Sequence, residues 1–96
     1  MATDEYHVHS SGRVTEQYRA VLRQAEVRGI LALALRASKW IMEELARTPM
    51  AFGESRDYLE HLDLRMRIGF AGPFSVQYAV HEPSRQVFIR SFTLGR

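Results

Sequence analysis

The sequence predicts an α+β fold in which a helical hairpin packs on one face of a small, mainly antiparallel sheet. Apolar residues recur with the 3.6-residue period of a helix from residue 13 to residue 47. They recur with the two-residue period of a strand from residue 62 to residue 93. Turns containing Gly or Pro separate the segments of this last third. The predicted order of elements is therefore βααβββ.

A short first strand is expected over residues 5–10, where β-forming and polar residues alternate weakly. Ser10, Ser11 and Gly12 then break the strand and offer an N-cap for a helix over 13–28. Gly29 is a plausible stop for this helix, and a second helix follows over 30–47, before Pro49. The apolar residues of the first helix have helical spacing: Val14, Tyr18, Val21, Leu22 and Ala25.

Residues 48–61 are predicted to be irregular, and three strands follow. The first spans 62–70, Leu-Asp-Leu-Arg-Met-Arg-Ile-Gly-Phe, in which the even-numbered apolar residues would face the core and Asp63, Arg65 and Arg67 the opposite side. Gly72-Pro73 turns the chain into a strand over 74–81, in which Tyr78 is expected to pack in the core. A turn over 82–85 leads to the last strand, over 86–93.

The sheet face not covered by the helices is the candidate functional surface. If Val87 and Ile89 face the core, Phe88, Arg90 and Phe92 turn outward, onto the same face as Arg65 and Arg67. Arginine contacts phosphate and aromatic rings stack on bases, so this surface suggests RNA binding. The alternative is that the arginines only form the solvated side of a half-buried sheet.

The composition limits the classes of protein to which the chain belongs. Its 96 residues are expected to form a single domain, and 46% of them are hydrophobic, as in a folded globular protein. The absence of cysteine excludes disulfides and thiolate metal sites. His7 and His9 offer half a metal site at most, so we expect neither metal nor cofactor. With no apolar run that spans a bilayer and no signal peptide, a cytoplasmic protein without a membrane partner is expected.

Several motifs, in order over nearly the whole chain, resemble the RelE/ParE superfamily of small bacterial toxins from toxin–antitoxin pairs. The second helix ends in Leu-Ala-Arg-Thr-Pro at residues 45–49, like the family's leucine followed closely by proline. A linker containing Gly53 leads to the strand with alternating basic residues. Residues 74–82, Phe-Ser-Val-Gln-Tyr-Ala-Val-His-Glu, are similar to the family's hairpin strand, and Gly95-Arg96 to its glycine-basic end.

The resemblance implies a βααβββ toxin whose partner is a cognate antitoxin. Members resembling RelE cut messenger RNA on the ribosome without a metal, which here implies Arg65, Arg67 and Arg90 as catalytic residues. RNA binding would involve these three residues together with Phe88, Phe92 and Arg96. Members resembling ParE act on DNA gyrase, and a third alternative is a non-catalytic binding protein.

Three departures from the family pattern keep these alternatives open. The linker over 53–61 is acidic where many of the nucleases are lysine-rich, and Ser75 stands where the family often has arginine. No residues after Arg96 supply a catalytic histidine or tyrosine. The apolar residues that one hairpin cannot bury, Phe88, Phe92 and Trp40 among them, predict a protein partner, either an antitoxin or a second copy of the chain.

Overall fold

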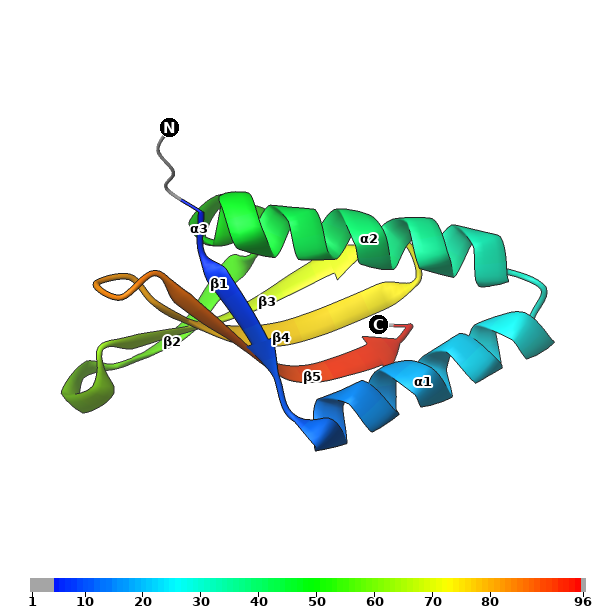
Figure 1. Ribbon diagram of the computed structural model, residues 1–96, viewed down its shortest axis with the longest axis horizontal. Coiled ribbons are helices and arrows are strands. Elements are labelled where there is room, and N and C mark those ends of the chain that lie inside the picture. Colours follow the sequence, from blue (N-terminus) through cyan, green and yellow to red (C-terminus); the bar gives the residue numbers. More distant parts are fainter. Residues whose placement is uncertain (1–4, 96) are drawn as a thin grey trace.

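The computed structural model describes residues 5–95 and has the α+β architecture expected from the sequence (Figure 1). The helices in these residues are α1 (Gly12–Val27), α2 (Leu31–Arg47) and the short α3 (Pro49–Phe52). The strands are β1 (His7–Ser10), β2 (Glu54–Leu59), β3 (Leu64–Ala71), β4 (Phe74–His81) and β5 (Gln86–Leu94), with one 3-10 turn over Glu60–Leu62. The α+β class and all four predicted strands are confirmed.

The strands form one mixed sheet in the order β1-β5-β4-β3-β2. The pairs β3–β4 and β4–β5 are antiparallel, as expected. The unpredicted β2 also pairs with β3 in antiparallel fashion, and β1 pairs with β5 in parallel. The prediction that residues 48–61 are irregular is wrong, because they contain α3 and the edge strand β2. Almost every side chain of β2 is exposed, so this strand lacks the apolar alternation that marks a half-buried strand.

Local capping explains where the helices begin and end. The Ser11 Oγ accepts a hydrogen bond from the backbone N–H of Val14 at 3.2 Å, so the predicted N-cap of α1 is confirmed. Gly29 has a φ of 76°, a left-handed conformation that ends α1. Pro49 follows two residues after the end of α2 at Arg47. None of the helices within residues 5–95 is long and apolar enough to cross a membrane.

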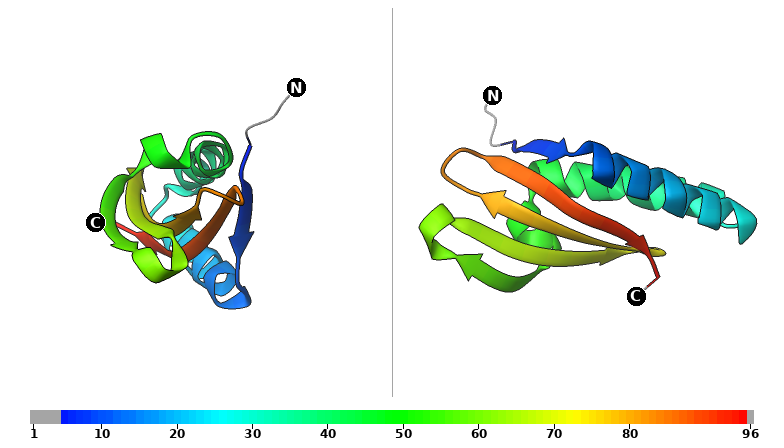
Figure 2. Two further views of the ribbon diagram at one scale, coloured as in Figure 1. Left: turned by 90° about the vertical axis from the view of Figure 1, so that its left-hand side faces the viewer. Right: turned by 90° about the horizontal axis from the view of Figure 1, so that it is seen from below.

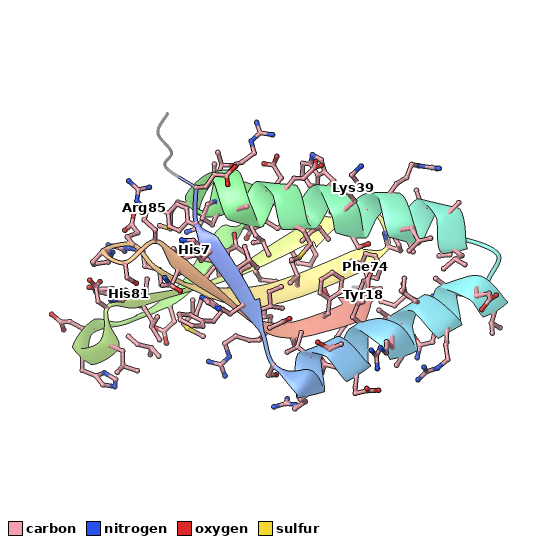
Figure 3. The ribbon with its side chains drawn as sticks, viewed as in Figure 1. His7, Tyr18, Lys39, Phe74, His81 and Arg85 are labelled. Carbon is pink, nitrogen blue, oxygen red and sulfur yellow. The ribbon has the colours of Figure 1, made fainter. Side chains whose placement is uncertain are left out.

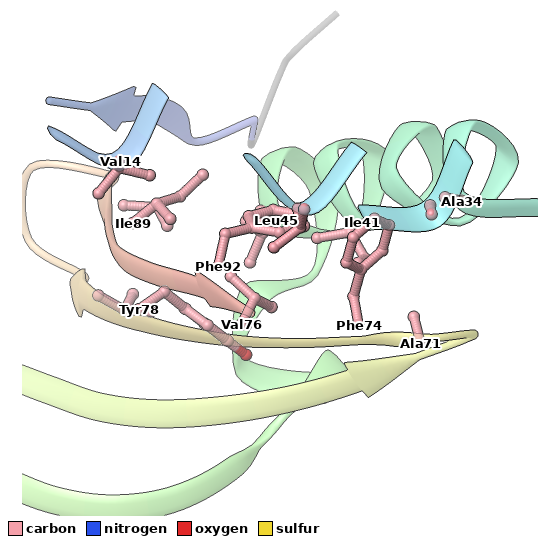
Figure 4. Packing of buried hydrophobic residues seen from close by; sticks show 14 residues of the cluster. Val14, Ala34, Ile41, Leu45, Ala71, Phe74, Val76, Tyr78, Ile89 and Phe92 are labelled. Atoms are coloured by element: carbon pink, nitrogen blue, oxygen red, sulfur yellow. The ribbon is translucent and has the colours of Figure 1, made fainter. Parts of the chain in front are cut away.

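Both long helices lie on the same side of the sheet, and no described helix covers the other side (Figure 2). The hydrophobic core fills the space between the helices and the sheet, with Tyr78, Phe74 and Ile41 among its largest fully buried side chains (Figure 4). The helical hairpin on one face of the sheet is therefore confirmed. We call the uncovered side the open face.

Candidate interaction surface

The side chains of β3 point in the opposite directions from those predicted. Arg67 pairs with Tyr78 and Arg65 with Val80, and directly paired residues of neighbouring strands project from the same face. Tyr78 and Val80 are fully buried on the helix side of the sheet. The two arginines therefore lie on the helix side. The apolar residues that were expected in the core lie on the open face: Leu64, Met66, Ile68 and Phe70.

Close packing on the helix side explains this orientation. The inward-facing residues that follow Arg67 along β3 are the small Gly69 and Ala71. A Cβ atom added to Gly69 would lie only 2.2 Å from a ring carbon of Phe52, so this ring already occupies the space beside the strand. The larger side chains of the even-numbered row would not fit there without moving α3.

Arg67 is a structural residue in this fold. Its guanidinium donates hydrogen bonds to the carbonyl oxygens of Met50, at 2.8 Å, and Gly53. The Tyr78 hydroxyl donates to the Pro49 carbonyl at 2.6 Å, so the two side chains together hold α3 and the start of β2 against the sheet. Burial raises the pKa of Tyr78 above its ordinary value, while the neighbouring Arg67 opposes the shift. Tyr78 thus packs in the core, as predicted.

Arg65 lies on the same side as Arg67 but near the end of the β3–β4 ladder that leads into the turn after β4, and it is partly exposed. Its Nε donates to the Glu82 carboxylate at 3.0 Å, and its guanidinium lies 4.6 Å from the centre of the Tyr58 ring. The Tyr58 hydroxyl in turn donates to Asp63 at 2.8 Å, and this hydrogen bond raises the pKa of Tyr58. Arg65 is therefore held within an exposed network of charged and aromatic side chains.

The prediction that Arg65, Arg67 and Arg90 together line the face not covered by the helices is wrong. Arg90 is the unpaired residue of a bulge in β5, between Ile89 and Ser91, and its side chain is exposed. Arg65 and Arg67 project toward the helix side. The predicted row of three arginines on the open face is therefore absent.

The two phenylalanines of β5 also lie on different faces. Phe88 is 40% exposed on the open face, as expected, and its ring stacks on His9 at 5.2 Å between centroids. Phe92 is only 3% exposed, so its predicted outward orientation is wrong. The ladder shifts at Arg90, because Gln77 pairs with Ser91 while the next residue, Tyr78, pairs with Ile89. This bulge returns Phe92 to the core. Arg96 lies outside the described residues.

The open face is mainly apolar at its centre. Met66 and Phe88 flank Ala79 across three strands, and Ala79 is buried between them. Leu64, Ile68 and Phe70 extend this patch along β3, with Phe70 39% exposed. Polar residues border it, including Ser75 and Thr93, whose hydroxyls are hydrogen-bonded at 2.6 Å. An apolar patch with a polar rim on an exposed sheet face is typical of a protein-binding surface.

The remaining candidates from the sequence do not assemble into a reactive centre. His81 is hydrogen-bonded to Ser84 at 2.5 Å, while Glu82 pairs with Arg65, so these neighbours do not form an acid–base pair. His9 contacts Gln86 and Phe88. Within residues 5–95, no group of three or more histidine, aspartate or glutamate side chains is arranged to hold a metal ion.

Comparisons with known proteins found no similar protein. No family model matches the chain, and neither does any curated protein or solved structure.

Proposed function

We propose that the chain is a toxin-like protein of the RelE/ParE kind, paired with a cognate antitoxin, that acts by binding proteins rather than by cutting RNA. The order of its motifs resembles that superfamily, and a helical hairpin on one face of an antiparallel meander is compatible with that resemblance. A cytoplasmic location belongs to the same proposal.

The position of Arg67 and the apolar centre of the open face carry the choice of binding over cleavage. A metal-independent nuclease needs several cationic side chains around one phosphate, since they must neutralise charge that develops in the transition state. Arg67 instead donates to backbone carbonyls, and neither Arg67 nor Arg65 lies on the open face. The centre of the open face is apolar, with Met66 and Phe88 on either side of Ala79. Protein partners commonly bury such surfaces.

Co-expression with the product of any adjacent small gene tests this proposal. Phe70→Ser and Phe88→Ser change exposed rings on the open face, so the double variant is expected to lose the partner in a pull-down. Leu33→Ser is the matched control, because Leu33 is also an exposed apolar residue, 45% accessible, but lies on α2. Retention of the partner by the open-face variant would contradict the proposal.

Mapping of messenger RNA ends after induction of the chain tests the same proposal against a nuclease. The expected result is growth arrest or no effect, without new RNA ends in either case. Arrest together with gyrase–DNA cleavage complexes would identify the gyrase-inhibiting form of the proposed protein-binding function. New message ends that disappear in the exposed variants Arg65→Met and Arg90→Met would show that the chain is a nuclease after all. A stable dimer without any other partner would assign the open face to self-association.

A further inference from the structure

The two long helices leave an apolar cleft between them on the side of the sheet opposite the open face. Its volume is about 340 Å³, near the lower end of the range for small-molecule sites, about 300–1,000 Å³. The floor consists of Ile89 and Phe92 from β5, and the walls include Tyr18 of α1 and Leu35 and Met42 of α2. Figure 3 shows Tyr18 and Lys39 on the two facing helices.

A second apolar row on α2 explains why the cleft exists. Ile41 and Leu45 of α2 face the sheet and are fully buried. Leu35 and Met42 lie seven residues apart, about two helical turns, and therefore share another side of the helix. Both are more than two-fifths exposed, so the core does not need them, although they line the cleft.

A hydrogen bond between side chains of α1 and α2 fixes the width of the cleft. The Ser38 Oγ donates to the Leu35 carbonyl at 3.0 Å, so the Tyr18 hydroxyl donates to the Ser38 Oγ at 2.8 Å. Ser38 is only 5% exposed, so this bond joins the helices below the surface. The pair also leaves acceptor lone pairs of the Tyr18 oxygen directed away from Ser38, next to apolar walls.

The charge of the lining defines the ligand. Among the described residues around the cleft, Lys39 alone carries a formal charge. The structure shows no hydrogen bond or ion pair of Lys39 with any other described residue. A lysine that is not neutralised, at the side of an apolar groove, favours a ligand with an anionic head and an apolar body.

We infer that the cleft between α1 and α2 binds a single-chain amphiphilic anion, such as a medium-chain carboxylate. The carboxylate pairs with the Lys39 ammonium, and the alkyl chain lies against Leu35, Met42 and the Phe92 floor. Water has a molecular volume of about 30 Å³ and a methylene group is of similar size, so the cleft accepts a chain of roughly ten carbons. The cleft and the open face lie on opposite sides of the sheet, so this site does not depend on the proposed function.

Isothermal titration with decanoate below its micelle concentration tests this site on the whole chain. The expected result is saturable binding at one site, with backbone amide NMR shifts at Tyr18 and Lys39 rather than at Phe88. Lys39→Met keeps the apolar stem and removes the charge, so it is expected to weaken binding about fivefold, the upper range for an exposed ion pair. Lys39→Glu should weaken binding further, while Arg36→Met, on the same helix but outside the lining, should have no effect.

Four results of these measurements would overturn the inference. These are no saturable binding, equal affinity of the Lys39→Met variant and the wild type, equally tight binding of decyltrimethylammonium, and amide shifts centred on the open face. Occupation of the cleft by a protein partner that decanoate does not displace would also exclude it. Circular dichroism of each variant separates loss of the site from loss of the fold.

Discussion

The contrast between Arg67 and Arg65 gives the sharpest test of the fold described here. The two residues are neighbours on the same side of β3, and an alternating-strand argument treats them alike. Arg67 holds the carbonyls of Met50 and Gly53, whereas Arg65 makes one exposed ion pair with Glu82. The matched substitutions Arg67→Met and Arg65→Met remove each charge while keeping most of the apolar stem.

The expected magnitudes follow from these contacts. A hydrogen bond from a charged donor contributes about 1.5–3 kcal/mol. Loss of two such bonds at a partly exposed site should therefore lower the free energy of unfolding by about 2–4 kcal/mol. An exposed ion pair contributes only about 0–1 kcal/mol, so Arg65→Met should have little effect. In a domain of this size, the first change lowers Tm by roughly 10–25 °C.

Urea unfolding followed by circular dichroism measures both variants under identical conditions. The slope of the transition should stay constant, so that a shift of its midpoint reports stability alone. Equal, small effects of the two substitutions would refute the assignment of Arg67 to the helix side. A larger loss for Arg65→Met would refute it as well.

Three further predictions concern packing and ionisation. Gly69→Ala places a methyl group against the Phe52 ring and should cost about 1–3 kcal/mol in urea unfolding; a neutral result would show that α3 moves freely. Phe92→Ala should cost about 3–5 kcal/mol because it empties a core position, whereas the half-exposed Phe88→Ala should cost clearly less. Because the folded pKa of Tyr78 is raised, its stabilising contribution is complete below pH 10 and is lost as pH rises through the folded pKa. Tyr78→Phe should therefore lose less stability than the wild type as the pH rises above about 10; identical pH profiles would contradict this.

The periodicity of the sequence predicts the fold class well but does not decide which face of a strand is inside. Residues 62–70 alternate, and the larger apolar set was the natural choice for the core. The structure buries Gly69 and Ala71 instead, because Phe52 approaches this strand closely. Strand alternation shows that there are two faces, and only the packing of the helices determines which of them is buried.

The candidate site was harder to predict than the fold, because a bulge changes the parity of a strand. Continued alternation from Val87 and Ile89 would place Ser91 in the core, but the extra residue Arg90 returns Phe92 to it. Sequence patterns rarely mark such a bulge. The sequence does indicate the cleft, because the first half of α2 has more apolar residues than the side that packs on the sheet can hold.

The parallel pairing of β1 with β5 has a consequence for synthesis of the chain. His7 pairs with Gln86, so the N-terminal strand finds its hydrogen-bonding partner only in the last element of the sheet. Contacts between such distant segments require closure of a long loop before they stabilise anything. We therefore expect β1 to stay accessible to protease on nascent chains stalled before β5 leaves the ribosome, and to become protected only after release.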